Sequence, residues 1–310
     1  MTGKQPLSFG DRCYRTYRKI RFLAKSGSLF SYRSGVVNYN NKQKAGDFTI
    51  IFLNSTFLYL LANILVSVVT RLSTGISALA FDIRSICYYY DINYLISGDK
   101  WTTDAVQAVF STGPLIALFL GILLFLLYIS VVAETGILRL LVLWMLAQSI
   151  VFFFGEMLMG ALFNKGIGFV IMYLFVMDTG KMLISVFAIV AMVALGIFLS
   201  RLFLFSGNIY FNYLNASNRR EFILNQFIYP FIAGNFLIFI IKLPEITIYE
   251  ICANATMILI LLPVAIRGMK TQDIYFDEDP RTITFSRKLA TATIVILLTY
   301  RVIFGFGLRL

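Results

Sequence analysis

Long apolar runs separated by short polar segments dominate the pattern of this 310-residue chain. A helix rises 1.5 Å per residue, so about 20 apolar residues cross the roughly 30 Å hydrocarbon core of a bilayer. Runs of this kind predict an all-α, polytopic integral membrane protein with about seven transmembrane helices. We expect the spans near residues 48–70, 107–133, 140–164, 182–203, 222–241, 246–266 and 289–308.

One apolar run is too short to cross a membrane alone. Residues 166–177 provide only twelve residues, and we predict that they form a re-entrant hairpin. If this segment crossed instead, eight spans would place the loops at 219–220 and 267–288 opposite the basic N-terminus. The tendency of Lys and Arg to stay on the cytoplasmic side favours seven spans.

Positive charge is concentrated before the first predicted span. The chain has a net charge of +11, and residues 1–47 hold ten Lys or Arg against two Asp. We predict two parts, a basic amphipathic arm at 1–47 on the cytoplasmic or matrix side and a single helical membrane domain at 48–310. Arg12, Arg15, Lys19 and Arg21 would lie on one helix that docks on anionic lipid or on a partner subunit.

The composition narrows the function classes. With 59% hydrophobic and 14% charged residues, the excess apolar surface must face lipid, so nucleic acid is not an expected partner. The chain has no histidine, and its three cysteines are far apart. This excludes a His-ligated zinc or haem site and a Ser–His or Cys–His nucleophile. We therefore expect no metal and no cofactor, and the balance favours a protein that is not an enzyme.

The strongest candidate for a functional site lies in the middle of the chain. Glu156 sits inside a predicted span, where an acid costs about 2.5–3.5 kcal/mol on insertion scales. We group it with Asn164, Lys165, Asp178 and Lys181 as an intramembrane polar or substrate site. The plainer alternative is a structural clasp, in which Glu156 pairs with a nearby Lys or Arg. A catalytic carboxylate is a third reading.

A second polar pair is predicted near the C-terminus. Arg301 lies within the last span and Glu250 within the preceding one, so we expect them to form a structural ion pair.

Three hypotheses for function follow. The first is a non-enzymatic membrane subunit or scaffold of a larger assembly, with the lipid bilayer and other membrane protein subunits as partners. The second is a transporter or channel that uses the polar site around Glu156. The third is a lipid-modifying enzyme with carboxylates at the headgroup level. We expect the protein in a bacterial cytoplasmic membrane or the mitochondrial inner membrane.

Overall fold

The computed structural model describes residues 45–131, 136–276 and 282–310. The arm residues Arg12, Arg15, Lys19 and Arg21 therefore lie outside the described residues. In the described part, seven helices are long and apolar enough to cross a membrane, which confirms the predicted fold class. They are α2 (Ala45–Leu79), α3 (Thr103–Val131), α4–η2–α5 (Ile137–Ile150, Val151–Gly155, Glu156–Phe163), α7 (Asp178–Phe205), α8–η4–α9 (Ala216–Ile223, Leu224–Ile228, Tyr229–Lys242), α10–α11 (Ile248–Ala255, Ile258–Met269) and α12 (Arg287–Gly305).

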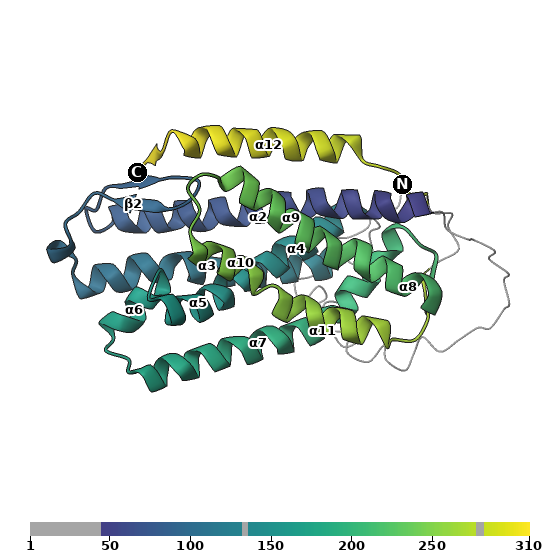
Figure 1. Cartoon of the computed structure of the whole chain (residues 1–310), viewed down its shortest axis with the longest axis horizontal. Helices are drawn as coiled ribbons and strands as arrows, with labels where there is room; N and C mark the ends of the chain where they lie inside the picture. Colours follow the sequence, from purple (N-terminus) through teal and green to yellow (C-terminus); the bar gives the residue numbers. More distant parts are fainter. Residues whose placement is uncertain (1–44, 132–135, 277–281) are drawn as a thin grey trace, which may run out of the picture.

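Successive spans run in opposite directions along the long axis of the molecule (Figure 1). The two ends carry different small sheets. At one end, called the sheet end below, β2 (Ile92–Tyr94), β1 (Ser85–Cys87) and β5 (Leu308–Arg309) form an antiparallel sheet with Ile86 opposite Asn93 and Arg309. At the other end, called the arm end because α2 begins there, β3 (Tyr213–Leu214) pairs with β4 (Ile274–Tyr275).

The short apolar segment after the third span does not cross. Its helix α6 (Ile167–Tyr173) has seven residues, about 10 Å long, and stays at the sheet end beside α3 and α5 (Figure 1). Two glycines permit this hairpin, since a Cβ on Gly168 would overlap the carbonyl oxygen of Gly160. Seven spans, rather than eight, therefore describe the topology.

The first span is longer than the sequence indicates. We expect it to end at Thr70, with a loop over residues 73–104, but α2 continues to Leu79. The charge at Arg71 does not end the helix because its guanidinium is satisfied by an acid and by loop carbonyls at the sheet end. The remaining loop forms β1, β2 and a short helix, η1 (Gly98–Lys100).

Aromatic side chains centred on Trp144 fill the middle of the bundle. The Trp144 ring meets Tyr59 edge-on at 5.1 Å between centroids and Phe203 at 5.8 Å. Its indole N–H donates to Ser55 Oγ at 3.0 Å, so the buried polar edge of the ring has a partner.

Polar residues recur every four positions along the buried face of α2. Tyr59 Oη accepts a hydrogen bond from Asn235 at 2.9 Å, and Asn63 donates to Gln148 Oε1 at 3.3 Å. These bonds join α2 to α9 and α4 inside the membrane, where each is worth about 0.6 kcal/mol on average.

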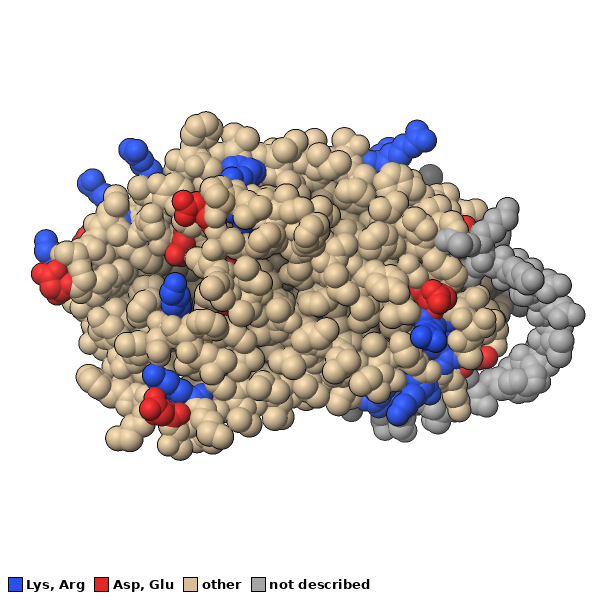
Figure 2. All heavy atoms as spheres, viewed as in Figure 1, with Lys and Arg blue, Asp and Glu red and all other residues tan. Residues whose placement is uncertain are grey.

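The surface shows where lipid and water meet the protein. On the face seen in Figure 2, a broad middle band without charges separates charged groups at the two ends. Within the described residues, the arm end carries eight Lys or Arg and three Asp or Glu, whereas the sheet end carries eight of each. The arm-end cations are Arg139, Arg201, Arg219, Arg220, Arg267, Lys270, Arg287 and Lys288.

Candidate functional site

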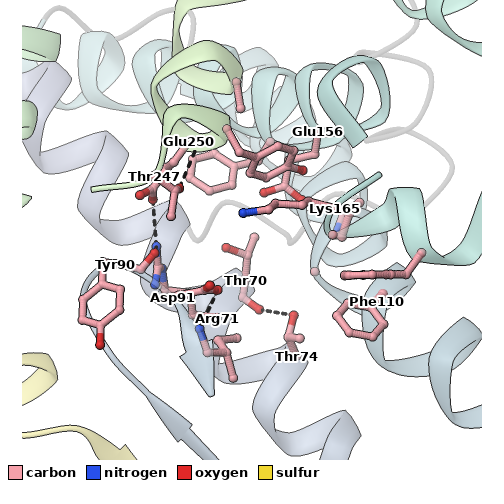
Figure 3. Close-up of a pocket in the computed structure, with 18 of the residues that line it drawn as sticks. Thr70, Arg71, Thr74, Tyr90, Asp91, Phe110, Glu156, Lys165, Thr247 and Glu250 are labelled. Atoms are coloured by element: carbon pink, nitrogen blue, oxygen red, sulfur yellow. Dashed lines mark hydrogen bonds and ion pairs between the residues drawn. The ribbon is translucent and has the colours of Figure 1, made fainter. Parts of the chain in front are cut away.

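A cavity of about 550 Å³ opens at the sheet end of the bundle. Its walls come from α2, the β1–β2 loop, α3, the η2–α5 helix, the turn before α6, and α10 (Figure 3). This volume lies within the range of small-molecule sites. Glu156 and Lys165 both line this cavity.

Glu156 is placed by a local irregularity in its helix. The π-helical turn η2 (Val151–Gly155) directly precedes it, and such turns often mark functional positions. Gly155 lets α10 approach closely, since a Cβ there would lie 3.2 Å from the Ala253 carbonyl oxygen and would overlap the Thr256 hydroxyl. Within the described chain, the Glu156 carboxylate has no hydrogen-bond or ion-pair partner. This arrangement does not support the structural clasp.

Lys165 reaches the cavity from the turn between α5 and α6. Asn164 and Gly166 flank it with φ values of 52° and 55°. The Gly166 backbone packs on Tyr249, whose hydroxyl would lie 2.9 Å from a Cβ at this position. Lys165 is exposed, and its ammonium points into the cavity (Figure 3). Among the described residues, no carboxylate lies within 4.0 Å of it.

A buried ion cluster forms part of the cavity wall. Arg71 Nη2 lies 2.8 Å from Glu250 Oε1, and Lys242 also contacts this oxygen. Arg71 further donates to the carbonyl oxygen of Tyr88 at 2.7 Å. The cluster therefore ties α2, α9, α10 and the β1–β2 loop together at the sheet end.

The predicted Glu250–Arg301 pair is wrong. Glu250 is held by Arg71 and Lys242, while the Arg301 guanidinium lies 3.5 Å from the centroid of the Tyr89 ring and donates to the Leu243 carbonyl oxygen at 2.9 Å. The reason is the position of α12, which packs along α2 and leaves Arg301 beside the sheet.

The other predicted site residues gather in a separate surface cluster. Lys181 donates to Asn164 Oδ1 at 2.9 Å and lies 3.8 Å from Asp178. The Asp178 side chain is fully exposed, and none of these three lines the cavity. The five residues that we group from the sequence are therefore split between two places, because α6 separates the start of α7 from the cavity.

Aromatic rings form another part of the cavity lining. Tyr94 meets Trp101 edge-on at 5.3 Å and Phe110 at 5.5 Å, and Phe110 contacts Phe169 at 4.9 Å. The pKa of Tyr94, which lies outside the spans, is raised by burial and then by nearby acidic groups, including Asp91 and Glu156. From the sequence, the aromatic residues near 88–101 are predicted to lie in the lipid headgroup zone. Their high density in this short loop is the sequence signal that could have indicated a ligand-binding surface.

The sequence does not assign two further polar groups to the cavity. The Tyr249 hydroxyl and Glu250 Oε2 are buried there and have no hydrogen-bond partner in the described part of the molecule. The described residues also contain no group of three Cys, Asp or Glu that could hold a metal.

Comparison with known proteins finds no matching family model, no similar curated protein and no similar solved structure. The chemistry of the cavity must therefore carry any functional argument.

Proposed function

We propose that this multi-pass membrane protein is a transporter whose substrate site is the cavity at the sheet end. The observation that carries the proposal is that Glu156 and Lys165, charges of opposite sign, line one cavity and lack partners among the described residues. Unpaired charge at membrane depth is costly and commonly marks a substrate or ion pathway.

The bundle is suited to one-sided access in this state. On the side of the cavity that faces the arm end lies the aromatic core around Trp144, a residue that is completely buried. Alternating access requires such a closed side, which opens when the bundle rearranges around the site. The basic arm end would face the cytoplasm or the matrix, and the cavity would open on the opposite side.

The two other hypotheses make different demands. A non-enzymatic subunit or scaffold, which the sequence favours, needs no accessible polar cavity. A lipid-modifying enzyme would use Glu156 or Glu250 near the headgroups, and access from the sheet end alone would suffice. Both stay predictions, and both predict a cavity that never opens toward the arm end.

Cysteine accessibility from each side of the membrane distinguishes transport from these alternatives. Thr74, which lines the cavity, would be changed to Cys in a chain whose three native cysteines are replaced by Ser. A membrane-impermeant thiol reagent would be added to one side of vesicles of known orientation. Transport predicts that Thr74→Cys reacts from both sides.

Two controls fix the sidedness of the vesicles. Ser97→Cys, in the exposed loop at the sheet end, should react from that side alone, and Gln272→Cys should react from the arm side alone. If Thr74→Cys behaves like Ser97→Cys under all conditions, the transport proposal is wrong.

A further inference from the structure

The free charges of the cavity differ in depth. Lys165 lies in the exposed turn at the mouth, and Glu156 lies two helical turns further along the span. Other charged side chains in the wall already have partners: Arg71 and Glu250 bind each other, and Asp91 accepts from the Ile92 N–H at 2.8 Å. In the described structure, Glu156 and Lys165 are thus the charged side chains of this wall that have neither a hydrogen bond nor an ion pair.

The lining favours a ligand with an apolar portion beside its charges. The cavity of about 550 Å³ exceeds what a bare ammonium and carboxylate would fill. The rings of Tyr94, Trp101 and Phe110 form a continuous wall within it. Such rings attract cations over their faces and also pack against apolar groups.

Two buried polar atoms without partners complement these charges. The Tyr249 hydroxyl can donate to an anionic group beside Gly166, next to Lys165. Glu250 Oε2 can accept from an ammonium group, since only its Oε1 is engaged by Arg71 and Lys242. Buried polar atoms without partners are uncommon in folded proteins and are often satisfied by a ligand or water.

We propose that the cavity binds a zwitterion that carries a protonated amine, an anionic group and an apolar portion, with its amine at Glu156 and its anionic group at Lys165. This inference rests on the proposed function and names its substrate class. An amino acid with an apolar side chain and the headgroup of an amine-bearing phospholipid share this chemistry.

Trp101 provides the readout, because it lines the cavity while the other tryptophan, Trp144, is fully buried in the core. The purified full-length protein in detergent would be titrated with phenylalanine, phenethylamine and 3-phenylpropionate while its fluorescence is recorded. The last two compounds carry only the cation or only the anion. Phenylalanine should bind about tenfold or more tightly than either, and Trp101→Phe should abolish the signal.

Two substitutions assign the charges. Glu156→Gln should weaken phenylalanine about tenfold but leave 3-phenylpropionate unchanged, and Lys165→Gln should weaken phenylalanine but leave phenethylamine unchanged. Asp178→Asn is the matched control, since this carboxylate is fully exposed outside the cavity, and it should change none of the three affinities.

Lipid as the source is tested in nanodiscs. If the ligand is a lipid, Trp101 emission should change as phosphatidylethanolamine replaces phosphatidylglycerol, and Glu156→Gln should remove the change. The inference is overturned if neither phenylalanine nor phosphatidylethanolamine gives a Trp101 signal, or if phenethylamine binds as tightly as phenylalanine. Two-sided labelling of Thr74→Cys together with either result would leave the transport proposal standing and reject only the ligand class.

Discussion

Arg71 of α2 and Glu250 of α10 lie 2.8 Å apart at the sheet end, although 179 positions separate them in the chain. Glu156 faces the same cavity without a partner in the described chain. On the transport proposal, the two acids therefore have different roles: Glu250 stabilises the wall, and Glu156 binds the ligand.

Loss of the Glu250 charge should destabilise the protein. Glu250→Gln would leave Arg71 and Lys242 close together without their shared acid, and removing one partner of a buried ion pair costs about 3 kcal/mol or more. We expect a lower thermal unfolding midpoint in detergent. Glu245→Gln, in the exposed loop just before α10, is the matched control and should unfold like the wild type. Equal midpoints for both variants would show that the ion cluster is not stabilising.

The turn that presents Lys165 should require glycine at position 166. A Gly166→Ala side chain would meet the Tyr249 hydroxyl at 2.9 Å, in a backbone region with positive φ that costs about 1–3 kcal/mol for other residues. We expect reduced stability and a slower reaction of an amine-specific, membrane-impermeant reagent with Lys165, followed by mass spectrometry. Gly98→Ala, whose added Cβ would contact nothing within 4 Å, should change neither.

The topology predicts the sidedness of the loops. Ser34→Cys and Thr271→Cys should react with an impermeant thiol reagent from the same side, because seven spans place both the arm and the end of α11 there. Ser97→Cys should react from the other side. Labelling of Ser34→Cys and Thr271→Cys from opposite sides would contradict the seven-span arrangement in favour of eight spans.

The arm should bind anionic membranes through its basic residues, since each Lys or Arg near such a surface contributes about 1 kcal/mol. A peptide of residues 7–26 should bind vesicles that contain phosphatidylserine and should dissociate as the salt concentration rises. The control peptide replaces Arg12, Arg15, Lys19 and Arg21 by Gln. Binding that is insensitive to salt, or equal for both peptides, would show that the apolar face alone is responsible.

The number of spans follows from the sequence because each apolar run must match the thickness of a bilayer. The partners of the charged residues do not follow from it. Glu250 could bind any nearby cation, and only the packing of α12 beside the sheet removes Arg301 from its reach. The extension of α2 past Arg71 likewise depends on a loop carbonyl and an acid distant in the chain.

The sequence likewise predicts only part of the candidate site. An acid within a span and glycines at a break are local signals, so Glu156 and the turn at Lys165 can be identified from the sequence. The cavity itself depends on how six chain segments pack together. From the sequence, Trp101 and Tyr94 are interpreted as interfacial aromatics, whereas the structure places them in the same cavity as Glu156. Asp178 is interpreted as part of the site, although its side chain is fully exposed.

The central claim is that Glu156 binds a ligand and does not stabilise the fold. The thermal stability of Glu156→Leu tests this claim most directly. An acid without a partner does not stabilise its helix, so replacing it by an apolar residue should be neutral or stabilising. We expect Glu156→Leu to unfold at or above the wild-type temperature in detergent, while Glu250→Leu, measured in parallel, unfolds well below it. If Glu156→Leu is destabilised as strongly as Glu250→Leu, then Glu156 is a structural clasp and the account is contradicted.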